Sequence, residues 1–112
     1  MDTMTFLKDT RFCEKVQIDK MFETPFSKEI RICMAEGNTM REHTAPGAIT
    51  IMVLKGRVRI DSLEESAELL SGDMIYFDAN VPHSLEAYEE SVIRLTLSKN
   101  DSAKRVFSLA GA

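Results

Sequence analysis

The sequence predicts an all-β domain, and three observations support that fold class. From about residue 29 onward, short apolar runs recur roughly every ten residues, as strands of a sandwich or barrel do. Glycine, proline, asparagine, aspartate or serine separates these runs and indicates turns. Residues 29–97 show no repeat with the 3.6-residue period of an amphipathic helix. The pattern therefore favours a β-sandwich or β-barrel over a helical bundle.

The first two predicted strands lie over residues 30–35 and 49–54. Residues 30–35 alternate apolar and polar side chains at their start and end at the turn sequence Glu-Gly-Asn over 36–38. Residues 49–54 form a nearly continuous apolar run rich in β-branched side chains. Such a run is typical of a strand that is buried on both faces. Gly56 interrupts it and marks the next turn.

A hairpin is predicted over residues 57–70. Residues 57–61 alternate cleanly, so we expect Val58 and Ile60 to point inward and the charged residues between them to point outward. Residues 62–66 carry the polar composition of a hairpin loop, and residues 67–70 form the return strand.

The last three predicted strands cover residues 74–77, 83–87 and 91–97. Residues 71–73, Ser-Gly-Asp, form a tight turn before the first of them. Residues 78–82 form a loop that ends in proline, which cannot donate a hydrogen bond to a sheet ladder.

The two ends of the chain are expected to lie outside the regular strand pattern. Residues 1–28 are interpreted as an N-terminal arm and residues 29–112 as the barrel. Phe6, Leu7 and Phe12 suit a short helix, and the later apolar residues of the arm suit a strand or an irregular segment: Val16, Ile18, Met21 and Phe22. Residues 102–109 follow two capping residues, Asn and Asp, and predict a short closing helix.

Composition limits the functional classes. A chain of 112 residues suits one domain, and a net charge of −4 with a pI near 5.2 offers no basic surface for nucleic acid or an anionic membrane. No apolar run approaches the ~18 residues of a membrane span. The first residues lack a secretion-signal pattern, so we expect a cytoplasmic protein. Cys13 and Cys33 are expected to be reduced and packed as small hydrophobic side chains.

The two histidines of the chain are each placed at a fixed spacing from glycines. His43 follows Gly37 and precedes Gly56, and His83 follows Gly72. In this respect the chain resembles the small single-domain cupins. Their first motif reads glycine, five residues, His-x-His, three or four residues, glutamate, six residues, glycine. Their second motif reads glycine, five residues, proline, x, glycine, two residues, histidine.

The chain departs from these motifs at four positions. Ala45 stands in place of the second histidine and Ile49 in place of the glutamate. Asp78 and Asn80 stand in place of the proline and the glycine of the second motif.

The resemblance covers roughly residues 30–98 and implies a double-stranded β-helix, or jelly-roll barrel. It also implies that the N-terminal arm adds a strand to the sheet of this subunit or of a partner, which would protect a sheet edge. We therefore expect a homodimer.

The metal of such barrels is held by three histidines and a carboxylate, and here only His43 and His83 match. We therefore expect no cofactor, or a weakly held divalent transition metal: Fe, Mn, Ni, Cu or Zn. Two histidines are fewer than the three protein ligands of a usual catalytic site. Asp78 or Tyr76 is a candidate third ligand. Glu42 and Glu86 have the wrong strand parity for that role.

With isoleucine replacing the glutamate, the pocket should be apolar with a polar spot at the histidines. The predicted pocket residues are His43, Ala45, Ile49, Ile51, Val53, Met40, Tyr76 and His83. The first hypothesis is a barrel that binds a small, largely apolar ligand. The second is a metal-dependent enzyme, such as a dioxygenase or an isomerase, that uses both histidines. The third is a structural or regulatory partner without a working pocket. Whether the protein is an enzyme stays open at this point.

Overall fold

The computed structural model describes residues 1–99, in which nine strands and no helix are present. The strands are β1 (Gln17–Glu23), β2 (Ser27–Met34), β3 (Thr39–His43), β4 (Ile49–Lys55), β5 (Arg57–Ser62), β6 (Glu65–Leu70), β7 (Met74–Phe77), β8 (His83–Ala87) and β9 (Ser91–Ser98). The all-β prediction is confirmed. The predicted closing helix over 102–109 lies outside the described residues.

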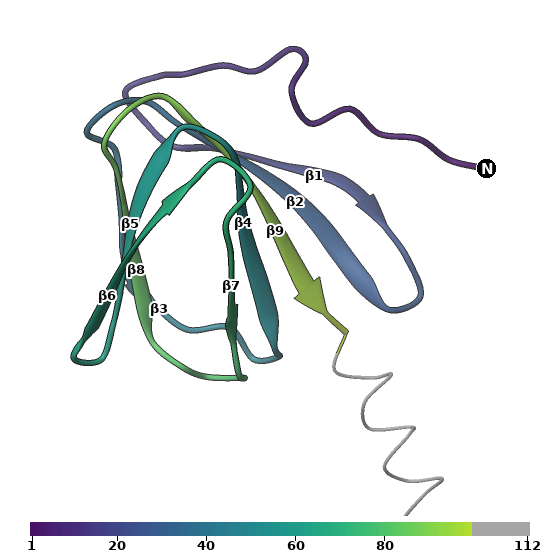
Figure 1. The fold of residues 1–112 in the computed structure, drawn as a ribbon. Helices are drawn as coiled ribbons and strands as arrows, with labels where there is room; N and C mark the ends of the chain where they lie inside the picture. Colours follow the sequence, from purple (N-terminus) through teal and green to yellow (C-terminus); the bar gives the residue numbers. More distant parts are fainter. Residues whose placement is uncertain (100–112) are drawn as a thin grey trace, which may run out of the picture.

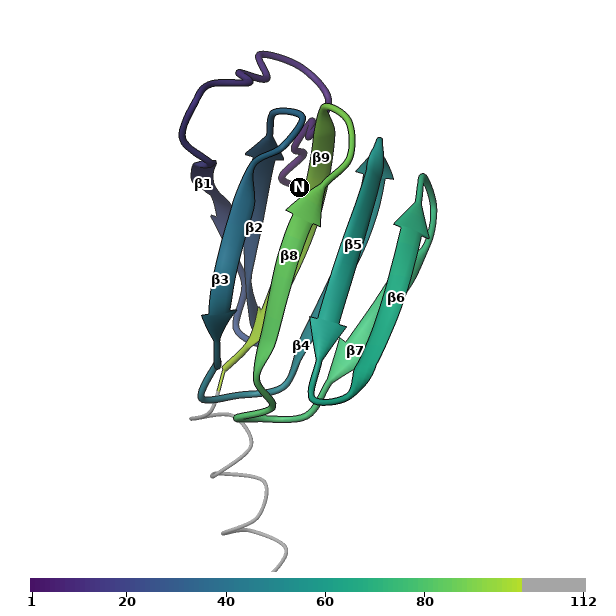
Figure 2. The same ribbon diagram turned by 90° about the vertical axis from the view of Figure 1, so that its left-hand side faces the viewer.

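The strands form two sheets that face each other (Figures 1 and 2). Sheet A has the order β1-β2-β9-β4-β7, and sheet B has the order β3-β8-β5-β6. Neighbouring strands are antiparallel. Figure 2 looks onto sheet B and shows that the β5–β6 hairpin, the β3–β4 loop and the β7–β8 loop lie at the same end of the two-layered structure.

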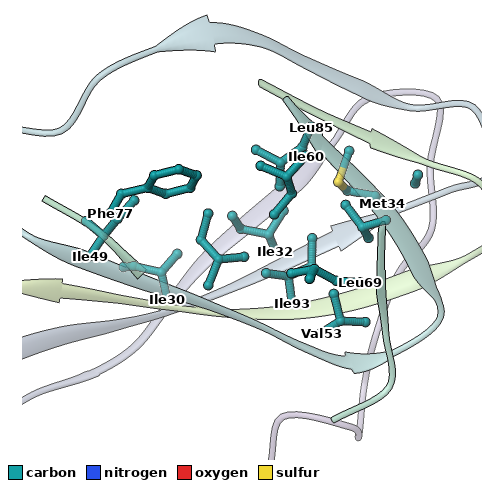
Figure 3. Packing of buried hydrophobic residues seen from close by; sticks show 13 residues of the cluster. Ile30, Ile32, Met34, Ile49, Val53, Ile60, Leu69, Phe77, Leu85 and Ile93 are labelled. Carbon is teal, nitrogen blue, oxygen red and sulfur yellow. The ribbon is translucent and has the colours of Figure 1, made fainter. Parts of the chain in front are cut away.

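The hydrophobic core lies between the two sheets and is made by alternate residues of β2 and of β4 to β9 (Figure 3). Val53 of β4, Val58 of β5 and Ile93 of β9 have no exposed surface. The predicted orientation of the 57–61 strand is confirmed, because Val58 and Ile60 are buried and the arginines beside them are exposed. The prediction that residues 49–54 are buried on both faces is wrong for the outer face, whose side chains are only half-buried.

The sequence left β1 open between a strand and an irregular arm, and it did not indicate β3. β1 forms one edge of sheet A and pairs with β2, so the irregular part of the arm ends near residue 16. The expected boundary at residue 28 falls inside β2. β3 forms one edge of sheet B and has a single apolar residue, Met40, which explains why its alternation is not visible.

The N-terminal residues pass over the outer face of sheet A and are held there mainly by Arg31 (Figure 1). The Arg31 guanidinium is buried and donates to the carbonyl oxygens of Phe6 and Lys8, at 3.4 and 2.8 Å, and to the Asp19 carboxylate at 3.1 Å. The arm therefore contacts the barrel of its own chain. The two cysteines are free, but the expectation that both are packed is met only by buried Cys33, since Cys13 is exposed.

Within residues 1–99 no helix is long and apolar enough to cross a membrane.

Candidate functional site

The two histidines lie opposite each other at one end of the barrel. His43, the last residue of β3, is the register partner of His83, the first residue of β8. Their ring centroids are 4.4 Å apart, with 66° between the ring planes. The two side chains that the sequence singled out therefore form a contact pair.

A β-bulge in β3 turns His43 toward this pair. Met40 pairs with Leu85, yet His43 and not Glu42 pairs with His83, so one extra residue is inserted in β3 between the two pairings. Because Leu85 and His83 share the inner face of β8, the bulge places His43 on that face as well. Without the bulge a carboxylate would occupy the position opposite His83.

His83 is held in place on three sides. Its side chain is 2% exposed, and its ring stacks on Phe77 with a centroid distance of 4.8 Å and an interplanar angle of 10°. Its Nδ1 lies 2.9 Å from the carbonyl oxygen of Val81. Burial lowers the pKa of His83 below 6.5, and the nearby His43 lowers it further, although the bond to Val81 acts in the opposite direction. His83 is therefore neutral at pH 7.

The backbone also fixes which ring nitrogen carries the proton. The His43 Nδ1 lies 2.7 Å from the Arg41 carbonyl oxygen. A carbonyl oxygen can only accept a hydrogen bond, so Nδ1 of each ring must carry a proton. Nε2 is then the ring nitrogen left for another partner, and neither Nε2 has a hydrogen-bond partner within residues 1–99. Neutral His83 therefore presents Nε2 as a hydrogen-bond acceptor, with the Nε2 of His43 beside it.

The other predicted pocket residues are distributed around this pair at different depths. Ala45 and Ile49 line a cavity of about 400 Å³ beside the β3–β4 loop, and Ile49 is also the register partner of Phe77. Met40 is half-buried against the core. Ile51 and Val53 are 2% and 0% exposed and belong to the core below the site.

Tyr76 does not share the face of the histidines. It alternates with Phe77 on β7, and Phe77 is the residue that points inward and contacts His83. The Tyr76 hydroxyl instead donates to the Asp78 carboxylate at 2.6 Å on the outside of the strand. The sequence did not single out Phe77, because its inward orientation follows from its register with Ile49 of β4, which the sequence does not show.

A larger cleft of about 840 Å³ adjoins the histidine pair. It lies between the β5–β6 hairpin and β7. β6 is an edge strand of sheet B, and β7 is an edge strand of sheet A. It is lined by Ile60, Ser62, Leu63, Glu64, Glu65, Ser66, Ala67, Ile75, Tyr76, Phe77, Asp78 and Val81. Phe77 and Val81 connect it to His83, since one stacks on the imidazole and the other accepts its hydrogen bond.

The side chains at this site do not fit the metal centre that the cupin resemblance implies. Within the described chain no group of three or more histidine, cysteine, aspartate or glutamate residues could hold a metal ion. Ala45 and Ile49 offer no ligand atoms, and the Asp78 carboxylate is engaged by Tyr76. The two imidazoles are the remaining metal-ligating groups, and we derive no metal-dependent step from them.

Comparisons with known proteins agree with the fold. The cupin domain family matches residues 30–98, and no curated protein matches the chain. An RmlC-like cupin from Desulfovibrio desulfuricans superposes with a TM-score of 0.80 at 18% identity, covering 88% of this chain and 96% of that one. An RmlC-like cupin with a double-stranded β-helix fold from Methanocaldococcus jannaschii gives 0.74 at 13% identity, with coverages of 94% and 96%.

KdgF from Halomonas sp. is similar at a TM-score of 0.70 and 20% identity, with 88% of this chain and 97% of that chain covered. At these identities the likeness shows the fold alone. The predicted double-stranded β-helix is confirmed, and the match over residues 30–98 spans more than half of the chain. This chain therefore belongs to the cupin family.

Proposed function

We propose that this cupin domain binds a small, largely apolar molecule whose polar head group donates hydrogen bonds to the histidine pair. The observation that carries the proposal is the pair of unpartnered Nε2 atoms at the end of an apolar barrel. Phe77 supplies the apolar surface next to them.

The hydrogen bonds of the two rings select the kind of head group. Both rings donate Nδ1–H to a backbone carbonyl, so Nε2 is the nitrogen that each ring offers to a ligand, and on neutral His83 it is an acceptor. A hydroxyl, phenol or other donor satisfies this acceptor. An ether of the same size leaves it without a donor, and unpaired polar groups at a binding site strongly reduce affinity.

The test compares 4-ethylphenol with 4-ethylanisole, which differs by methylation of the donor. We expect the phenol to raise the melting temperature and the ether to have little effect. At a ligand concentration of 100 times Kd the gain is about 2.7 kcal/mol. For a domain of this size this corresponds to a shift of about 10 °C.

His83→Phe and His43→Phe are the matched variants. Phenylalanine keeps a flat ring, which at position 83 can still stack on Phe77, but it lacks the acceptor nitrogen, so the fold should remain while the preference for the phenol disappears. Circular dichroism checks the fold. Equal shifts with both ligands, or a phenol preference that survives both substitutions, would contradict recognition by the imidazoles.

Metal-dependent catalysis is a second candidate because each histidine donates Nδ1–H to a carbonyl oxygen. Metal-binding histidines commonly have such an arrangement, which orients Nε2 toward the metal. Elemental analysis of protein purified without affinity-tag metal tests it. Near one equivalent of metal, lost in His83→Phe, would favour this candidate over the first.

The expected homodimer and cytoplasmic location stay predictions. A purely structural or regulatory role is the third candidate, and it requires that both histidine substitutions leave every binding property unchanged.

A further inference from the structure

We infer that the cleft between the β5–β6 hairpin and β7 binds the positively charged tail of the ligand, so that an aryl or alkyl amine is preferred over a neutral or acidic analogue. This inference deepens the proposed function and rests on it for the head group at the histidines. The cleft chemistry is argued from its own residues and is tested separately.

The cleft combines apolar walls with carboxylates at its rim. Ile60, Ala67, Ile75, Phe77 and Val81 provide the walls, and at about 840 Å³ the space accommodates a small organic molecule. The hairpin side is fixed to the β7–β8 loop, because the Ser62 hydroxyl donates to the Pro82 carbonyl oxygen at 2.6 Å.

The charge of the rim has one sign. Glu64, Glu65 and Asp78 line the cleft, and no lysine or arginine does. The Asp78 carboxylate is held in position by the hydrogen bond from Tyr76, whereas the two glutamates form no salt bridge within residues 1–99. A cation in the cleft would meet complementary charge, and an anion would be repelled.

The hairpin tip supplies a second unusual feature. Leu63 is the first of two loop residues between β5 and β6 and has a φ of +56°, a left-handed conformation that usually holds glycine at this position. Its side chain is 77% exposed and lines the cleft. Because the Leu63 side chain is exposed, core packing does not offset the energetic cost of its left-handed backbone. We therefore expect this side chain to contact the ligand.

The cleft and the histidine pair are joined through Phe77. Neither histidine lines the cleft, so the inferred ligand extends past Phe77 to place its donor head on the imidazoles, with its ammonium group among the carboxylates. Tyramine, 4-ethylphenol and 4-hydroxyphenylacetate share the phenol and differ mainly in tail charge. These three compounds are the probes, and phenethylamine, which lacks the hydroxyl, is the fourth.

Isothermal titration calorimetry at low salt measures the four affinities. We expect tyramine to bind about two- to fivefold more tightly than 4-ethylphenol, within the range that exposed ion pairs supply, and 4-hydroxyphenylacetate to bind most weakly of the three phenols. The preference for tyramine should shrink in 0.5 M salt, because the distance over which charges interact falls toward the Debye length of about 3 Å at 1 M salt.

Two charge-matched double variants locate the effect. Glu64→Gln/Glu65→Gln should abolish the preference for tyramine. Glu68→Gln/Glu86→Gln removes the same charge from exposed positions on β6 and β8 that do not line the cleft, and it should retain the preference. Leu63→Gly should keep or raise the melting temperature and weaken tyramine binding at the same time.

The outcomes distinguish failure of the inference alone, failure of the proposed function alone and failure of both. Equal affinities for the three phenols, or a tyramine preference unchanged in Glu64→Gln/Glu65→Gln, would overturn the inference and leave the function standing. Phenethylamine binding that depends on the two glutamates, without binding of 4-ethylphenol, would support the inference and overturn the phenol-recognising function. Absence of binding by all four compounds would overturn both.

Discussion

Gly56 is the residue at which a single methyl group should be most damaging to the barrel. It connects β4 to β5 with a φ of +104°, and a Cβ added there would lie 2.5 Å from the Glu90 carbonyl oxygen and 2.7 Å from the Ser91 Cα. It would also collide with the Ser91 hydroxyl. The Ser91 side chain is fully buried and accepts from the Arg57 N–H at 3.1 Å, so it has no free space into which it can move.

The cost of Gly56→Ala has two parts. The left-handed conformation costs an L-residue about 1–2 kcal/mol. Forcing a methyl group against buried backbone adds about 1–3 kcal/mol. The sum of about 2–5 kcal/mol is a large part of the 5–15 kcal/mol by which a typical domain is stable.

Gly72→Ala is the matched control for this prediction. Gly72 has a similar φ of +94°, but no atom lies within 4 Å of the added Cβ, so only the conformational cost of about 1–2 kcal/mol remains. Urea unfolding followed by circular dichroism gives both values, and the difference between them measures the collision. Equal destabilisation by the two substitutions would refute the reasoning.

Three further predictions concern charge and metal binding. The free energy of unfolding should fall as the pH drops from 7 to 5, because the pKa of His83 in the folded protein lies below its value of 6.5 in the unfolded chain. Urea unfolding at several pH values measures this fall. The fall should be smaller in His83→Phe. Burial raises the pKa of Glu29, but hydrogen bonds from Ser27, Thr96 and Arg94 outweigh it and lower the pKa below 4.5. Glu29→Gln should therefore lower the free energy of unfolding by about 1.5–3 kcal/mol at pH 7. The difference in this free energy between the variant and the unmodified protein should shrink as the pH falls below 4.5. A difference that does not change with pH would contradict this assignment. Purified protein should contain well under one equivalent of transition metal, because two imidazoles form an incomplete site, and elemental analysis checks this value.

The fold could be predicted because its signals are local. The strands β4 to β9 are bounded by residues with turn preferences, and the alternation over 57–61 identifies the buried face directly. β3 could not be found in this way, because it is a short edge strand in which four of five residues are exposed. Edge strands owe their structure to pairing with a neighbour that is distant in sequence, here β8.

The site was only partly predictable for a similar reason. His43 and His83 could be named from their spacing to glycines, but their contact depends on a bulge in β3 that no pattern in the sequence indicates. Phe77 was missed and Tyr76 chosen instead, since both are aromatic neighbours on one strand and only the register with Ile49 distinguishes them. The division into an arm of residues 1–28 and a barrel of residues 29–112 stays a prediction, although β2 begins at Ser27 and pairs with β1.

The replacements at positions 45 and 49 change the chemistry of the whole site. A carboxylate at position 49 would favour protonated imidazoles, because an opposite charge within a few ångströms raises a histidine pKa. Ile49 provides no such charge, and burial then lowers the pKa of His83. Both Nδ1 protons are committed to the carbonyls of Arg41 and Val81, and His83 stays neutral at pH 7. The barrel therefore presents the Nε2 acceptor of His83 beside His43 and against Phe77, and this is why we place recognition of a donor group before metal chemistry.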